Sequence, residues 1–168
     1  MTADARDYAR WALLRDYQAV EPSVEVVRVK RDGDDAVVAA RFEDQSGRPR
    51  RAMVGFVSVD GAWRGTGGFS EAAQSTGDAH PAWHSGFWSH SGGRRLVSGF
   101  WVAEPTAVSL RVTDVAGRVL ADTVEGGVAV VVGSGDFDVS RATVELLDAD
   151  DGVIVAGPVW PAPGLGSG

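Results

Sequence analysis

Three histidines lie close together in the sequence and are the residues best suited to chemistry. His80 and His84 are four positions apart, and His90 follows in the same segment. Three imidazoles around an open fourth position are a ligand set used by catalytic zinc. A spacing of four residues brings side chains together only on a helix, and Pro81 and Gly86 disfavour a long helix here. The pattern therefore gives zinc binding as a hypothesis; the alternative is a loop whose histidines flank buried aromatic side chains.

Large aromatic side chains crowd into the same part of the chain. The candidates for a binding surface are Trp83, Phe87, Trp88 and Trp101. If these rings are exposed, they would stack on a sugar, a peptide or a partner protein, because Trp anchors interfaces. If they are buried, they would instead fill the space between two structural units. We favour burial, since most large aromatic residues serve protein cores.

A single acidic residue interrupts the apolar stripe of a predicted N-terminal helix. A buried Asp16 beside a second titratable group would resemble the acid–base pair of an enzyme. The alternative is an aspartate at the end of the stripe that is exposed or paired with Arg15, Arg28 or Arg41. The chain has no cysteine and no Gly-Xaa-Ser-Xaa-Gly motif, so neither a thiol nor a serine nucleophile can be named. These observations favour a protein that is not an enzyme and leave catalysis undecided.

Two short segments rich in glycine or aspartate fit strands and turns better than ligand sites. Residues 65–68 read Gly-Thr-Gly-Gly but lack the lysine and the helix of a phosphate-binding loop. Asp148, Asp150, Asp151 and Gly152 resemble part of a calcium-binding loop but lack its later acidic ligand. We interpret the second segment as a hairpin turn.

The charge and hydropathy of the chain argue against several classes of partner. The formal net charge is −7 and the basic clusters are short, so we expect no nucleic-acid binding. The N-terminus lacks the pattern of a signal peptide, and no apolar run approaches the roughly 20 residues of a transmembrane helix. We therefore expect a soluble, cytoplasmic protein without membrane insertion, with an exported mature form as the alternative. The excess of arginine over lysine, 15 to 1, is typical of a bacterial protein from a GC-rich genome.

Hydrophobic periodicity predicts one helix followed by strands. An amphipathic helix is expected over residues 4–20, because apolar side chains recur there on one broad stripe. The first strand that follows is rich in β-branched residues, but its apolar phase slips between Val26 and Val27. A β-bulge or burial of both faces would explain that slip.

The turn signals divide the chain into four parts. Residues 1–70 are predicted to form the helix and a four-stranded antiparallel sheet, and residues 95–160 a small β-sandwich, because short strands recur there between turns. Between them, residues 71–94 are expected to be an aromatic- and histidine-rich connecting loop. Residues 161–168, rich in Pro and Gly, are predicted to be a flexible tail.

Two segments carry a resemblance to known folds. VDGAWRGTGG, with Gly61, Ala62 and Trp63 in its last hairpin, resembles the small cystatin-like or NTF2-like sheets of bacterial proteins. FWVAEPTAVSLRVTDVAGRVLADTVEGGVAVVV resembles the Ig-like sandwich that follows such a unit in some bacterial proteins. The resemblance implies a mainly β fold of the α+β class, with a helix on a four-stranded meander and then an Ig-like sandwich. NTF2-like enzymes have several N-terminal helices; one helix here argues against an enclosed active site.

The expected function is that of a non-enzymatic binding or interaction module whose partner is a protein or a small molecule. One alternative is an NTF2-like small-molecule binder or enzyme that uses the concave face of the first sheet. Another is a structural subunit of a larger assembly, in which exposed strand edges pair between chains and the protein is an oligomer. No cofactor is expected apart from the zinc considered above.

Overall fold

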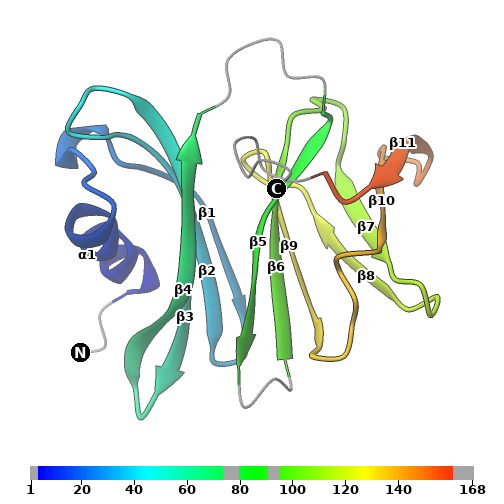
Figure 1. The fold of residues 1–168 in the computed structure, drawn as a ribbon, viewed down its shortest axis with the longest axis horizontal. Coiled ribbons are helices and arrows are strands. Elements are labelled where there is room, and N and C mark those ends of the chain that lie inside the picture. The colour runs from blue at the N-terminus through cyan, green and yellow to red at the C-terminus, as the bar shows by residue number, and fades with distance from the viewer. Residues whose placement is uncertain (1–3, 74–79, 91–94, 161–168) are drawn as a thin grey trace. The chain divides into compact units, whose positions relative to one another are not determined.

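The chain divides into two compact units, residues 1–78 and 79–168. The computed structural model describes residues 4–73, 80–90 and 95–160, and for residues 87–90 it describes the backbone alone. The described residues form one α-helix, one short 3₁₀ helix and eleven strands, and neighbouring strands are antiparallel (Figure 1). The expectation of a mainly β protein with one α-helix near the N-terminus is thus confirmed.

The N-terminal unit begins with helix α1, Ala5–Asp16. Asp4 caps its first turn by accepting a hydrogen bond from a backbone N–H. The predicted helix limit at residue 20 is wrong. Tyr17 closes the last turn, and Gln18 then adopts a left-handed backbone with a φ of 58°, which a helix cannot continue through.

Four strands follow α1 and form one sheet in the order β1-β2-β3-β4. Their bounds are β1 Glu25–Asp32, β2 Asp35–Glu43, β3 Pro49–Val59 and β4 Ala62–Ala72. The pairing of β1 with β2 skips one residue between Val26 and Arg28. This irregularity confirms the bulge predicted from the slip at Val27.

Helix α1 packs on one face of this sheet through small side chains. Three alanines of the helix share a buried cluster with side chains of β2 and β3: Ala5, Ala9, Ala12, Ala36, Val38, Val54 and Phe56. Leu13 belongs to a second cluster with Ala40, Phe42 and Ala52. Most of β2 and β3 is buried, whereas β4 contains no buried residue. The helix therefore leaves the part of the face formed by β4 uncovered.

The C-terminal unit contains two sheets, with strand orders β5-β6-β9 and β11-β10-β7-β8. The first comprises β5 Ala82–His90, β6 Arg95–Val102 and β9 Val128–Ser134. The second comprises β7 Ser109–Thr113, β8 Val119–Thr123, β10 Thr143–Leu147 and β11 Val153–Pro158. Both sheets contribute side chains to one apolar core, including Phe100, Leu110, Val131 and Leu146.

The segment 71–94, predicted as a connecting loop, contains a strand. β4 extends to Ala72, and β5 occupies most of the second half of the segment. β5 lacks the alternation of a half-exposed strand because Ala82 and Trp83, which point to opposite faces, are both buried. Residues 74–79 and 91–94, and the predicted tail 161–168, lie outside the described residues.

Three hairpin loops share one geometry: residues 44–48, 114–118 and 148–152. In each, the carboxylate of the first residue, an aspartate, accepts hydrogen bonds from the backbone N–H groups two and four positions later. The fourth residue of each loop has a left-handed backbone, with φ of 73° at Gly47, 81° at Gly117 and 60° at Asp151. The hairpin turn predicted for the last loop is confirmed, and its first carboxylate is engaged by the loop itself.

Replacing Asp151 with glycine is expected to stabilise the C-terminal unit by roughly 0.5 kcal/mol. A left-handed backbone is unfavourable for an L-residue, less so for aspartate, and the greater chain entropy of glycine offsets part of the gain. The reciprocal change Gly117→Asp, in the equivalent loop, is the matched control and should destabilise by a similar amount. Urea unfolding measures both variants, and shifts of the same sign would contradict this explanation.

Candidate functional site

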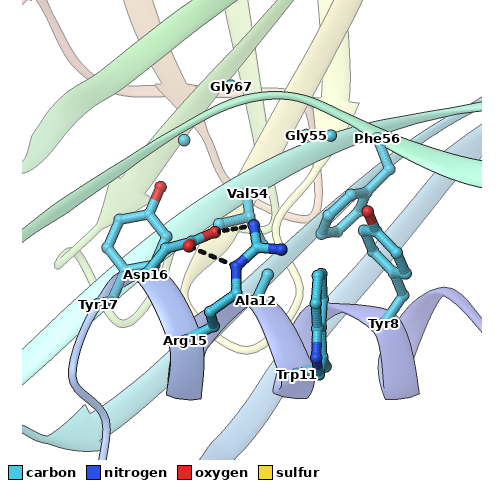
Figure 2. Close-up of a pocket in the computed structure, with 12 residues that line it drawn as sticks. Tyr8, Trp11, Ala12, Arg15, Asp16, Tyr17, Val54, Gly55, Phe56 and Gly67 are labelled. Carbon is cyan, nitrogen blue, oxygen red and sulfur yellow. Dashed lines mark hydrogen bonds and ion pairs between the residues drawn. The ribbon is translucent and has the colours of Figure 1, made fainter.

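The clearest candidate site is a pocket in the N-terminal unit, between α1 and strands β3 and β4 (Figure 2). Its volume is about 340 Å³. The helix and its C-terminal end contribute Tyr8, Trp11, Ala12, Arg15, Asp16 and Tyr17 to the lining. The strands contribute Val54, Gly55, Phe56, Gly65, Gly67 and Gly68. The pocket exists because α1 does not cover the part of the sheet face that β4 forms.

One wall of the pocket is a row of aromatic rings. Phe56 is buried and meets Tyr8 edge to face, with ring centroids 5.0 Å apart. Tyr8 in turn lies 5.3 Å from Trp11, centroid to centroid, and Trp11 is 46% exposed. The spacing of three residues places Tyr8 and Trp11 on the same side of α1. A row of rings that ends in a partly exposed tryptophan provides an apolar surface that a ligand ring can contact.

The floor of the pocket consists of glycines, so the strand backbone itself lines it. A Cβ atom at Gly65 would meet no atom within 4 Å, which shows that this position faces empty space. A Cβ atom at Gly68 would instead clash with the Tyr17 hydroxyl and lie 2.8 Å from Val54. Glycine at this second position therefore makes room for the tyrosine side chain. The register of β3 against β4 also shifts here, just after Gly55.

The glycine floor was not predicted from the sequence. Residues 65–68 do not form a phosphate-binding loop; they lie inside strand β4. Glycine is uncommon within strands and often marks a place where a ligand or another backbone approaches closely. Three glycines within four residues are the sequence signal that could have marked this part of β4 as such a place.

An ion pair lies between Tyr17 and Trp11 in the pocket (Figure 2). The Arg15 guanidinium donates two hydrogen bonds to the Asp16 carboxylate, each 2.6 Å long. Its central carbon also lies 3.9 Å from the centroid of the Trp11 ring. Both charged side chains are about half exposed, 55% for Arg15 and 44% for Asp16. Asp16 is therefore exposed and paired with Arg15, one of the arrangements expected from the sequence.

This pairing makes Asp16 a poor general acid or base. The hydrogen bonds from Arg15 lower the pKa of the Asp16 carboxyl below its ordinary value of 3.8. A catalytic carboxyl needs a pKa close to the working pH, which burial would provide. No histidine lines the pocket among the residues that the structure describes. The enzyme hypothesis built on Asp16 gains no support from this geometry.

The tryptophans named as candidates for a binding surface are buried where their side chains are described. Trp83 is 4% exposed and Trp101 is 2% exposed, which confirms the burial favoured from the sequence. Neither ring presents a face for stacking on a partner. The side chains of Phe87 and Trp88 lie outside the described part of the chain, although the backbone places both residues in β5.

The histidines of the zinc hypothesis differ in their environments. His84 is largely buried, shares a hydrogen bond of 2.7 Å between its Nε2 and the Ser98 hydroxyl, and lines a second pocket, in the C-terminal unit. His80 is exposed, with its ring centroid 6.3 Å from that of Trp160. The side chain of His90 is not among those described. Within the described residues no group of three His, Asp or Glu side chains is placed to hold a metal ion, and zinc binding stays a prediction.

No known protein family matches this sequence, and no curated protein matches it either. In the described residues no helix combines the length and the hydropathy needed to span a membrane. A functional proposal therefore depends on the geometry of the N-terminal pocket.

Proposed function

We propose that this protein is a non-enzymatic binding module that holds a small molecule in the pocket between α1 and strands β3 and β4. The observation that carries the proposal is the glycine floor of β4, open at Gly65, which lines the same pocket as the aromatic row Tyr8, Trp11 and Phe56. A volume of about 340 Å³ lies at the lower end of the range for ligand pockets and suits a small ligand.

The lining of the pocket favours a flat ligand. Gly65 has no side chain and faces open space, so a planar molecule can approach the backbone of β4 closely there. Trp and Tyr rings supply large contact areas and lose little conformational entropy when a ligand binds. A ring that lies on the floor can therefore contact Tyr8 or the part of Trp11 that Arg15 leaves exposed.

The groups that line the pocket favour binding over catalysis. Burial raises the pKa of Tyr17 above its ordinary value of 10.0, so the phenol stays protonated at neutral pH. Asp16 is held ionised by Arg15 over the same range. Neither group is poised to exchange a proton near pH 7, as a general acid or base must be.

The two units also support the fold assignments implied by the resemblance. A helix on one face of a four-stranded antiparallel sheet is in keeping with a cystatin-like or NTF2-like N-terminal unit. Two antiparallel sheets around one apolar core are in keeping with an Ig-like C-terminal unit. Both assignments are part of the proposal.

A variant that fills the pocket tests the proposal. We expect Gly65→Phe to abolish the binding of indole, used as a planar probe, because the new side chain occupies the space that faces this position. The backbone at Gly65 does not have a left-handed φ, so the substitution leaves the fold intact. Ala62→Phe, at an exposed position outside the pocket lining on the same strand, is the matched control and should bind indole like the wild type.

The binding is measured by titrating indole and following the backbone amide NMR signals of Gly67 and Gly68. A ligand of this size is expected to bind with a dissociation constant on the order of 1 mM. Two results would count against the proposal. One is an unperturbed set of pocket amides at high indole concentration, and the other is an equal affinity in Gly65→Phe and the wild type.

A further inference from the structure

The charges that line the pocket cancel within a single pair of residues. Arg15 donates from Nε to Oδ1 of Asp16 and from Nη2 to Oδ2, so both carboxylate oxygens are engaged. No further Asp, Glu, Lys or Arg belongs to the described lining. The pocket therefore contains two ions but has no net charge.

The Arg15 guanidinium also contacts an aromatic ring. It stacks on the Trp11 ring at 3.9 Å, a distance at which a cation is attracted to the aromatic face. Figure 2 shows the pair rising from the helix between Tyr17 and Trp11. A ring bound on the glycine floor would thus lie beside an ion pair whose charges already satisfy each other.

We infer that the ligand is an uncharged molecule with a planar aromatic ring, an inference that rests on the proposed function. A ligand carboxylate attracted by Arg15 would also be repelled by Asp16, because the charged atoms of the pair are 2.6 Å apart. A ligand cation attracted by Asp16 would likewise be repelled by Arg15. Either ion would give up water without finding an unpaired counter-ion. An uncharged ring avoids this loss and still gains contact with the aromatic wall.

Three probes with the same ring and different charges test the inference: indole, which is neutral, indole-3-acetate, which is an anion, and tryptamine, which is a cation. The wild-type protein is expected to bind indole about two- to five-fold more tightly than either ion, since exposed charge pairs contribute on this scale. The titrations follow the amide signals of Gly67 and Gly68 at low ionic strength, because salt weakens the effect.

Two single substitutions should each weaken the preference for indole over one of the ionic probes. Asp16→Asn leaves Arg15 without its counter-ion, so indole-3-acetate should gain about two- to five-fold in affinity. Arg15→Gln leaves Asp16 alone, so tryptamine should gain by a similar factor. Both side chains are about half exposed, and Asp16→Asn also removes an anion from the C-terminal end of α1, so the fold is kept.

The outcomes separate the inference from the function on which it rests. If none of the three probes perturbs the pocket amides, the proposed binding function fails and the inference fails with it. If indole binds but an ionic probe binds the wild type as tightly or more tightly, the inference is overturned and the binding function stands. The same holds if neither substitution raises the affinity of its ionic probe relative to that of indole.

Discussion

Acidification from about pH 6.5 to about pH 4 is expected to destabilise the C-terminal unit by about 3 kcal/mol through His84 alone. Burial lowers the pKa of His84 from 6.5 to about 4, against a smaller opposing effect of the Gly86 backbone. The imidazole lies 5.1 Å from the Phe100 ring, centroid to centroid, and shares a hydrogen bond with the Ser98 hydroxyl. These surroundings favour the neutral ring over the charged one.

The sign of the effect follows from proton binding. Below pH 6.5 the unfolded chain takes up a proton at His84, whereas the folded chain does so only near pH 4, so the unfolded state holds more protons in this window. The free energy of unfolding therefore falls as the pH falls through the window, by about 1.4 kcal/mol for each pH unit. Asp138, in the same pocket wall, has a pKa lowered below 3.8 by its hydrogen bonds to Ser140 and Arg141, so its contribution is lost only at lower pH.

Native-state hydrogen exchange of the β6 and β9 amides measures this loss in the intact protein. We expect His84→Gln, which keeps a polar group beside Ser98 but cannot titrate, to flatten the pH dependence of protection between pH 6.5 and 4. His80→Gln removes an exposed histidine of the same unit and should leave the slope as it is in the wild type. An equal slope in His84→Gln and the wild type would exclude His84 as its source.

Replacing Arg51 with methionine is expected to destabilise the N-terminal unit by about 3–5 kcal/mol, as is usual when one member of a buried ion pair is removed. The Nε of Arg51 lies 3.0 Å from Oε1 of Glu71 on the neighbouring strand, and the two side chains are 8% and 10% exposed. Burial raises the pKa of Glu71 above its ordinary value, and the charge and hydrogen bond of Arg51 oppose this shift. Without Arg51, the Glu71 carboxylate remains buried and loses the positive charge and the hydrogen bond that stabilise its ionised form.

The cost of Arg51→Met should shrink as the pH falls. Because the folded state raises the pKa of Glu71, ionisation of this group works against folding at neutral pH, and protonation in acid removes the penalty. The double variant Arg51→Met with Glu71→Leu replaces the whole pair by apolar side chains and should recover to within about 1 kcal/mol of the wild type. Urea unfolding at several pH values gives both results. A cost that does not change with pH, or no recovery in the double variant, would rule out the stranded carboxylate as the cause.

Periodicity was sufficient to predict α1 and the strands of the first sheet. Ala5, Ala9 and Leu13 recur every four residues, and all three are buried against the sheet. The end of the helix could not be predicted this way, because glutamine is a common helix residue and its type does not reveal that Gln18 adopts a left-handed backbone. Strand β5 was not predicted, because burial of both its faces removes the alternation of apolar and polar residues by which a strand is recognised.

The pocket could not be predicted because it joins elements that are distant in the sequence. Only the register of β3 against β4, which pairs Gly65 with Phe56, and the packing of α1 bring Gly65 into the same pocket as the aromatic row. The density of aromatic residues around Trp83 indicated a core, as favoured from the sequence, and gave no information on where the pocket lies. Trp83 is buried, whereas Trp11, which has no other Trp or Phe near it in the sequence, is the exposed ring beside the pocket.

The order in which strands pair has a consequence for how the chain folds as it is synthesised. In the N-terminal unit each strand pairs only with its neighbours in the sequence, from β1 to β4. In the C-terminal unit β6 pairs with β9 and β7 pairs with β10, each across two intervening strands. Closing short loops is fast and closing long ones is slow. The first sheet can therefore be complete while the ribosome is still adding β9, and the slowest folding step belongs to the C-terminal unit.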